Sequence, residues 1–329
     1  MNTSAIFGRL AWLGAVLAIA TLIAGGAFAD TYPAKPIRLV VPFPPGGATD
    51  IVGRLVGEKL GERLGQTVVI ENRGGAGTII GAGAVATSPA DGYTLLISSG
   101  STFTINPAIN PKLPYDPVRS FEPIGLIARV PLVLLANRDV PVDNVKQFIS
   151  AVQAAPDKYV YGSFGHGTTG HFAGELLLNA TGLKMQHVAY RGSAPAMNDL
   201  LGGQIPFTID TVAAALPHLK TGKIKAIAVT GANRATLLPD VPTVAESGFP
   251  GFEFDSWLAV VAPRGLPADV KTRLDKALAD TMADPELREK LIANGLEPTY
   301  DSATAVASLI DRELPRIREV AERANIRAD

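Results

Sequence analysis

Short β-rich apolar runs alternate with helix-patterned segments along most of this chain. Strands are predicted over residues 37–43, 67–71, 93–98, 122–136, 159–162, 185–189, 206–209, 226–230 and 257–262. The segments between them carry apolar residues at helical spacing, such as Val52, Val56 and Leu60, with Asp50 expected as the N-cap of that helix. Alternation of this kind is typical of parallel sheets with crossover helices, so it predicts an α/β fold.

The C-terminal part has a different pattern. Helices are predicted over residues 268–282, 285–293 and 303–324, with little strand signal between them. About 300 residues is long for one α/β core, so two lobes are expected. Two apolar strands, 124–136 and 254–262, are expected to run from one lobe to the other and to act as a hinge. Domain 1 is then residues 30–128 and 255–329, and domain 2 is residues 129–254, with a ligand cleft between them.

The N-terminus has the pattern of a secretory signal. A single Arg9 precedes an apolar stretch over residues 10–23, and Ala27-Phe28-Ala29 forms an A-x-A cleavage site before Asp30. An uncleaved anchor helix is the alternative, but the apolar stretch is shorter than the roughly 20 residues of a membrane span. Residues 1–29 are therefore predicted to be removed, which leaves a soluble periplasmic protein with no direct membrane insertion.

Composition excludes several classes of protein. The chain has no cysteine, so it has neither disulfides nor thiolate metal sites. Without Arg9 the 30 basic residues become 29, and 29 against 31 acidic residues gives a net charge of −2. No long run of one sign occurs, so no nucleic-acid partner is expected.

The segment after the first strand is a candidate anion site. The strand over residues 37–43 ends in Pro44-Pro45-Gly46-Gly47, and a helix follows directly. A helix N-terminus gathers unpaired backbone N–H groups and the positive end of the helix dipole, which suits a carboxylate. The glycines either let the anion approach the backbone or serve only a turn with positive φ.

Several short motifs resemble one known family. They are Val41-Pro42-Phe43 with Gly46-Gly47 and Asp50, then Glu71-Asn72-Arg73-Gly74-Gly75-Ala76-Gly77, Ala90-Asp91-Gly92-Tyr93, Tyr190-Arg191-Gly192-Ser193-Ala194-Pro195 and Leu238-Pro239-Asp240-Val241-Pro242. In this order they resemble the Bug, or tripartite tricarboxylate transporter, substrate-binding family over nearly all of the mature chain. The resemblance implies a type II-like, two-lobed periplasmic binding protein (a Venus flytrap) with a discontinuous first domain.

The resemblance also implies a function and a site. Such a receptor captures a small carboxylate (a di- or tricarboxylate, an aromatic acid or an acidic amino acid) and delivers it to the membrane subunits of the transporter. It is expected to act as a monomer, without enzymatic activity or cofactor. The ligand contacts carried over are Phe43, Gly46, Gly47, Ala48, Asp50, Ser99, Ser101, Gly165, Gly167, Thr168, Thr169, Arg191 and Asp210. The two helix N-termini at the loops over residues 43–50 and 162–171 would each neutralise one end of a dicarboxylate.

Two of these contacts have alternative roles. Asp210 could accept a hydrogen bond from a ligand amine or hydroxyl, or it could cap the helix that follows at Thr211. Arg191 could bind a carboxylate through its guanidinium, or its loop could contribute only the backbone.

An enzymatic function is the alternative hypothesis. Residues 75–81 form a G-x-G-x-x-x-G run, close to a dinucleotide fingerprint, with Asp91 as a possible ribose ligand. An exported NAD(P)-dependent oxidoreductase would use this loop, but nicotinamide cofactors are scarce in the periplasm. No catalytic residue is predicted. His166, His171 and Glu175 lack the spacing of a metal site, so no metal is expected either.

Overall fold

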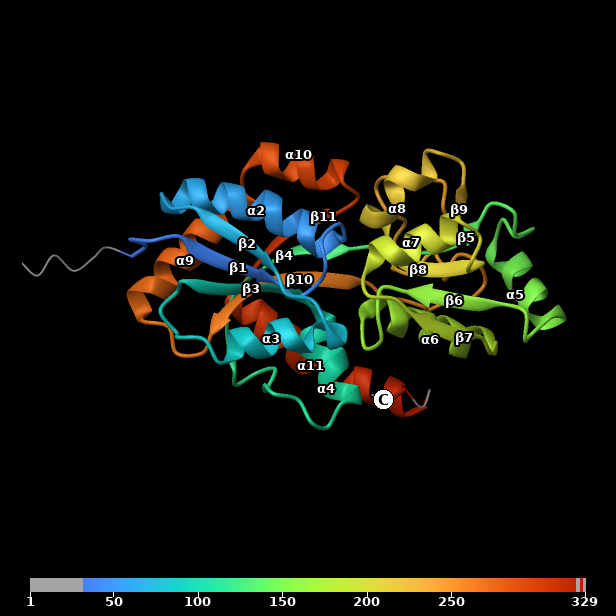
Figure 1. The fold of residues 1–329 in the computed structure, drawn as a ribbon, viewed down its shortest axis with the longest axis horizontal. Coiled ribbons are helices and arrows are strands. Elements are labelled where there is room, and N and C mark those ends of the chain that lie inside the picture. Colours follow the sequence, from blue (N-terminus) through green and yellow to red (C-terminus); the bar gives the residue numbers. More distant parts are fainter. Residues whose placement is uncertain (1–31, 324–325, 328–329) are drawn as a thin grey trace, which may run out of the picture. The chain divides into compact units, whose positions relative to one another are not determined.

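Two mixed β-sheets with helices on both faces make up the structure, a computed structural model that describes residues 32–323 and 326–327 (Figure 1). Both sheets lie in one compact unit that begins at Lys35. The predicted α/β class is confirmed, but the expectation of parallel sheets is wrong because each sheet also contains antiparallel pairs. The predicted signal peptide, residues 1–29, lies outside the described residues.

The first sheet has six strands in the order β11-β4-β10-β3-β1-β2. They are β1 (Ile37–Val41), β2 (Val68–Asn72), β3 (Thr94–Ser99), β4 (Phe121–Val130), β10 (Ser256–Pro263) and β11 (Glu297–Ser302). The helical segments that accompany them are α2 (Ala48–Leu64), η1 (Ala76–Thr78), α3 (Ile79–Ala86), η2 (Ser101–Ile105), α4 (Asn106–Ile109), α9 (Ala268–Met282), α10 (Pro285–Ala293) and α11 (Ala303–Arg323). β1 is parallel to β2 and β3, whereas β10 is antiparallel to both β3 and β4.

The second sheet has five strands in the order β7-β6-β8-β5-β9. They are β5 (Leu132–Asn137), β6 (Val160–Ser163), β7 (Gln186–Ala189), β8 (Phe207–Thr211) and β9 (Ile224–Val229). Its helices are α5 (Val145–Ala154), α6 (Thr169–Thr181), α7 (Ser193–Leu201) and α8 (Val212–Leu219). Because β6 is parallel to β7 and β8, these strands present their carboxyl ends, and the loops that follow, at the same edge.

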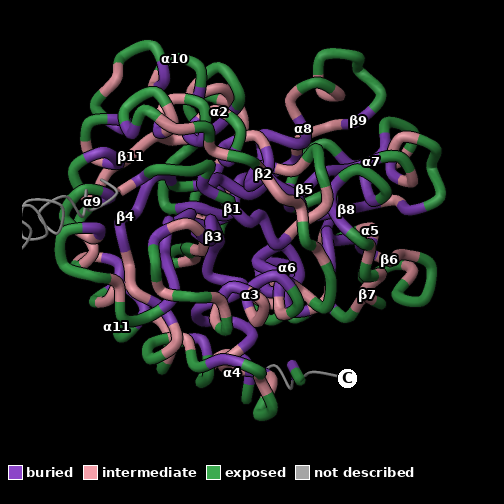
Figure 2. The backbone as a smooth tube through the Cα atoms, turned by 60° about the vertical axis from the view of Figure 1, so that its left-hand side comes forward, coloured by how far each residue is buried: buried purple, intermediate pink, exposed green. Residues whose placement is uncertain are grey.

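Successive side chains of a strand point to opposite faces of the second sheet, which divides its core into two layers. On β5, Leu132 and Leu134 pack with α5 and α6, whereas Val133 and Leu135 pack with α7 and α8 on the opposite face. β3 is buried throughout and β1 is buried except at Arg38, as Figure 2 shows along both strands. A strand buried on both faces has little freedom to shift, so the loops at its end are held firmly.

The chain passes between the sheets at Pro131 and again before β10. The single strand predicted over residues 122–136 is two strands, because Pro131 has no N–H group to continue the ladder. β4 belongs to the first sheet and β5 to the second. Whether the sheets move as separate domains, with boundaries at residues 128/129 and 254/255, stays a prediction.

Two local predictions were wrong. Gly47 is the N-cap of α2, and Asp50 lies inside the first turn. The edge strand β11 was not predicted, because Glu297–Ser302 is largely polar and lacks the alternation of a half-buried strand. It is fixed by antiparallel pairing with β4, a contact that local sequence does not reveal.

Candidate functional site

A narrow cavity of about 30 Å³ lies where loops from both sheets meet. It continues into a wider cleft of about 900 Å³, and Phe43, Pro44, Phe164 and Gly192 line both parts. The walls come from the carboxyl ends of β1, β3, β6 and β8 and from the loops that follow them. This is the edge at which open α/β sheets bind ligands.

The lining of the narrow cavity combines apolar side chains with hydroxyl groups and carries no charged side chain. Its described residues are Phe43, Pro44, Gly47, Ala48, Thr49, Ser99, Val130, Phe164, Thr169, Gly192, Ser193, Thr211, Ser256 and Leu258. None of them is acidic, basic or a histidine. Phe43 and Phe164 meet edge to face across it, with ring centroids 6.1 Å apart. Any charge that enters must therefore be stabilised by hydroxyl groups and by the backbone.

The first turn of α2 supplies unpaired backbone donors. Gly47 has φ −89° and offers no side chain as a cap, and its carbonyl accepts from the N–H groups of Asp50 and Ile51. The N–H groups of Ala48 and Thr49 have no hydrogen-bond partner among the described residues. Ala48 and Thr49 line the cavity at the positive end of a 17-residue helix, which favours an anion there.

Asp50 supports this loop and does not line the cavity. One carboxylate oxygen, Oδ2, accepts from Gly46 N at 3.0 Å and from Arg54 Nε at 3.1 Å. The other, Oδ1, accepts from Asn72 Nδ2 at 2.9 Å. Burial opposes ionisation, but these hydrogen bonds outweigh it and hold the pKa of Asp50 below its usual value. The predicted ligand contact is therefore a carboxylate already occupied in holding Gly46, whose φ of +94° suits glycine.

The first turn of α6 contacts the first sheet directly. Thr168 caps the helix by accepting from the N–H of His171. The N–H of Thr169 donates to Ser101 Oγ at 3.1 Å, from the segment that follows β3. Ser101 and Gly167 lie outside both parts of the lining, whereas Thr168 and Gly165 line the wider cleft. The α6 N-terminus is thus partly occupied by a bond across the cleft.

A third helix N-terminus was not predicted as a donor. Gly192, with φ +111°, is the N-cap of α7 and provides no side-chain cap. The N–H groups of Ser193 and Ala194 have no partner among the described residues. Ser193 lies opposite α2, because a Cβ placed on Gly47 would be 3.5 Å from Ser193 Oγ. The first residues of α2 and of α7 therefore line the narrow cavity from opposite sides.

The remaining predicted residues divide by position. Arg191 is exposed and lines the wider cleft. Asp210 is fully buried behind Ser193 and Thr211 and lines neither part. Sequence reasoning missed four hydroxyl side chains of the narrow cavity, Thr49, Ser193, Thr211 and Ser256. The usable signal for Ser193 and Thr211 was their place at the start of a helix after a strand.

Three histidines stack beneath the first turn of α6. The ring centroids of His166 and His171 are 4.7 Å apart, and those of His171 and His187 are 4.1 Å apart. Burial, followed by the neighbouring imidazoles, lowers the pKa of His171 to about 2. The residue is therefore neutral at physiological pH, and its Nδ1 accepts from Gly167 N at 3.4 Å. Among the described residues, no group of acidic or histidine side chains is arranged to hold a metal ion.

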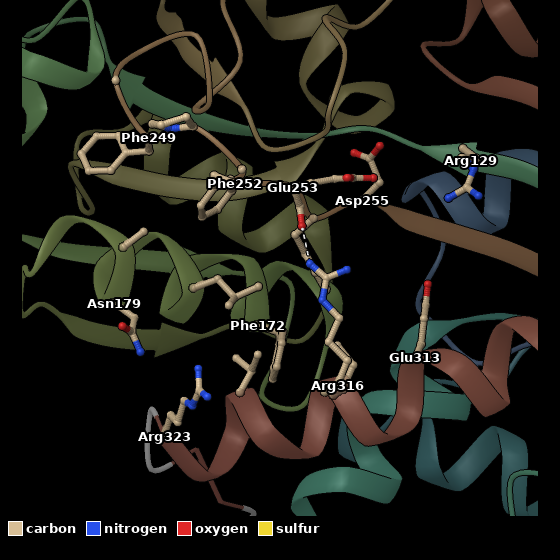
Figure 3. A pocket seen from close by; sticks show the side chains of 18 residues that line it. Arg129, Phe172, Asn179, Phe249, Phe252, Glu253, Asp255, Glu313, Arg316 and Arg323 are labelled. Atoms are coloured by element: carbon tan, nitrogen blue, oxygen red, sulfur yellow. Dashed lines mark hydrogen bonds between the residues drawn. The ribbon is translucent and has the colours of Figure 1, made fainter.

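A second cavity of about 560 Å³ lies between α6, α11 and residues 248–255 (Figure 3). Phe172, Phe249 and Phe252 line one end, together with the polar side chains of Asn179 and Arg323. The other end has charges of both signs, from Arg129, Glu253, Asp255, Glu313 and Arg316. Arg316 Nη2 donates to the carbonyl of Glu253 at 3.4 Å. Because acids and arginines neutralise one another here, this cavity lacks the anion preference of the narrow one.

The loop of the enzymatic alternative lines the wider cleft and touches the loop that precedes α6. A Cβ on Gly77 would lie 2.4 Å from the carbonyl oxygen of His166, so the two loops touch. Asp91 accepts from the N–H of Tyr93 within its own turn, at 3.0 Å.

Within residues 32–323 and 326–327, no helix has the length and apolar character needed to cross a membrane.

Comparison with known proteins identifies the family. The tripartite tricarboxylate transporter family receptor matches this chain over residues 52–326. Protein BugT of Bordetella pertussis (strain Tohama I) is 37% identical over 308 residues, which are 93% of this chain and 94% of BugT.

Solved structures of two similar proteins have the same fold as this chain. The periplasmic binding protein BugD is 37% identical with a TM-score of 0.85, over 91% of this chain and 100% of BugD. R. palustris Rpa4515 with adipate is 38% identical with a TM-score of 0.87, over 90% of this chain and 99% of that one. The chain therefore belongs to the tripartite tricarboxylate transporter receptor family, whose members are extracytoplasmic solute-binding proteins. It shares their α/β fold with two mixed sheets, and it is not an enzyme.

The two glycines of the α2 loop should respond differently to substitution. Gly47 has an ordinary φ and room for a Cβ, so Gly47→Val should fold, but its methyl groups would project toward Ser193 and fill the narrow cavity. Isothermal titration should show that Gly47→Val binds the carboxylate ligand at least tenfold more weakly than wild type does, a loss of about 1.4 kcal/mol of binding free energy. Gly46→Ala, at φ +94°, should lower the free energy of unfolding by about 1–2 kcal/mol instead. A wild-type Kd for folded Gly47→Val would remove this loop from the site.

His171 should steepen acid denaturation. In the unfolded chain it takes up a proton below its ordinary pKa of 6.5, while the folded protein does not until about pH 2. Its contribution therefore lowers the free energy of unfolding as pH falls below 6.5, by up to about 1.4 kcal/mol per pH unit. Urea unfolding of His171→Gln between pH 6.5 and 4 should show a shallower slope than wild type. His218→Gln, outside the stack, is the matched control, and equal slopes in all three proteins would contradict this interpretation.

Proposed function

We propose that this receptor captures a small dicarboxylate in the cleft between its two sheets and delivers it to the membrane subunits of a tripartite tricarboxylate-type transporter. One observation carries the proposal: Ala48 and Thr49 of α2 and Ser193 of α7, whose N–H groups have no hydrogen-bond partner among the described residues, line one uncharged cavity. Each helix N-terminus is equivalent to roughly half a positive charge. Such a site attracts a carboxylate without an ion pair to a side chain.

The placement of the donors favours an acid with two polar ends. α2 follows a strand of the first sheet, whereas α6 and α7 follow strands of the second. A ligand that accepts from Ala48 or Thr49 at one end and from the second-sheet loops at the other would bind both sheets at once. The structure of Rpa4515, with adipate, supports a diacid as the ligand class.

Binding of such an acid requires the walls to separate first. A cavity of about 30 Å³ accommodates about one or two water molecules. The bond from Thr169 N to Ser101 Oγ and the contact of Gly77 with His166 hold the two sides together. We place the hinge at Pro131 and at the segment before β10, with residues 30–128 and 255–329 as one domain and residues 129–254 as the other. Ligand would then stabilise the closed arrangement.

The proposal includes export of the protein to the periplasm and a partnership with the membrane subunits of the transporter. Residues 1–29 would act as a cleavable signal peptide, and the mature chain would work as a periplasmic monomer. The family description, a receptor of a tripartite tricarboxylate transporter, supports membrane subunits as the partner.

A ligand panel tests the proposal. Thermal-shift measurements with di- and tricarboxylates, aromatic acids, amino acids and NAD(P) should show stabilisation by diacids. At one hundred times Kd the gain is about 2.7 kcal/mol, which raises the melting temperature measurably. Isothermal titration of the best acid should give a Kd near micromolar or below, about −8 kcal/mol, because a transport receptor must hold scarce solute. Only millimolar binding throughout, or a shift with NAD(P) alone, would contradict solute capture.

A further inference from the structure

Ser193, at the start of α7, lies opposite the α2 loop. It is the first residue of α7, it is 8% exposed and it lines the narrow cavity. Its Oγ would lie 3.5 Å from a Cβ on Gly47. A ligand bound at the α2 N-terminus therefore lies next to this hydroxyl.

Asp210 determines which way the Ser193 hydroxyl points. The acid lies near the end of β8 with no exposed surface, and its Oδ1 accepts from Ser193 Oγ at 2.8 Å and from the N–H of Thr211 at 2.7 Å. Thr211 Oγ1 is 3.4 Å from the same oxygen. The other oxygen, Oδ2, is buried with no partner among the described residues. Burial raises the pKa of Asp210 to about 6, so the carboxylate is still mostly ionised at pH 7 and above.

A serine hydroxyl has one proton and two lone pairs. Because the ionised Asp210 cannot donate, Ser193 must direct its proton to that carboxylate. Only lone pairs of Ser193 Oγ then remain for the cavity. A ligand carboxylate oxygen next to them is repelled, whereas a hydroxyl or ammonium group of the ligand finds an acceptor.

We infer that the Ser193–Asp210 pair makes the cleft select carboxylic acids that bear a hydrogen-bond donor beside a carboxylate, such as 2-hydroxy or 2-amino diacids, over the same acids without one. This inference rests on the proposed function, because it assumes that a carboxylate binds at the α2 N-terminus. Ser193 is the group that meets the ligand donor. Asp210 is a positioning residue that acts through Ser193.

Succinate and malate are the probes, because they differ by one hydroxyl group. Isothermal titration at pH 7.5 should give wild type at least tenfold tighter binding of the better malate enantiomer than of succinate. That factor corresponds to about 1.4 kcal/mol. Ser193→Ala removes the acceptor and should reduce the ratio to within about twofold, mainly by weakening malate.

Two variants of Asp210 separate positioning from support of the fold. Asp210→Asn keeps an oxygen that can accept from both Ser193 and Thr211, so it should retain the preference for malate. Asp210→Ala frees the Ser193 proton to donate to a carboxylate and should lose the preference, with succinate gaining relative to malate. A purely structural role of Asp210 would instead weaken both acids by the same factor.

Ser256→Ala is the matched control. Ser256 lines the same cavity but makes no hydrogen bond to Asp210, so its removal should change both affinities alike and leave their ratio unchanged. Equal micromolar binding of succinate and malate by wild type, or an unchanged ratio in Ser193→Ala, would overturn the inference and leave the proposed function standing. No binding of any acid in the panel would overturn both.

Discussion

The unpaired backbone N–H groups at the start of α2 and α7 determine how the loops of this cleft must be held. A buried N–H group without a partner costs about 1–3 kcal/mol, so a loop that keeps such groups free must be held by other bonds. Asp50 provides them for α2, because it binds Gly46, Arg54 and Asn72 together. The loop can then present Ala48 and Thr49 without collapsing onto them.

In the proposed function, recognition through the backbone accounts for a narrow cavity whose described lining has no charged side chain. A buried arginine beside the ligand would need its own compensation whenever the cleft opens. Helix N-termini avoid this, since their partial charges are part of the fold and are solvated by water when the ligand leaves. Specificity then depends on hydroxyl groups, whose direction neighbours such as Asp210 fix. The same acid thus shapes the cleft without lining it.

Sequence reasoning found most of the strands, the α/β class and the α2 loop, because these follow from local periodicity and from a helix start after a buried strand. It failed where distant segments decide the outcome. β11 forms only through pairing with β4, and the Thr169 N–H is occupied by Ser101 across the cleft. Asp50 was placed at the N-cap because capping residues are usually acidic or hydroxylated, but Gly47 holds that position and Asp50 binds back to Gly46. Side-chain direction places Ser193 in the lining of the narrow cavity and Asp210 behind it. No local sequence pattern encodes that direction.

A crystal structure of the protein with malate, and a second with adipate, tests the account most directly. The account predicts that a carboxylate of the diacid accepts hydrogen bonds within about 3.2 Å from the N–H of Ala48 or Thr49, and that the hydroxyl group of malate, not a carboxylate oxygen, lies beside Ser193 Oγ. A diacid held instead by Arg191 at the mouth, or between Arg129 and Arg316 in the second cavity, with the α2 N–H groups untouched, would contradict it.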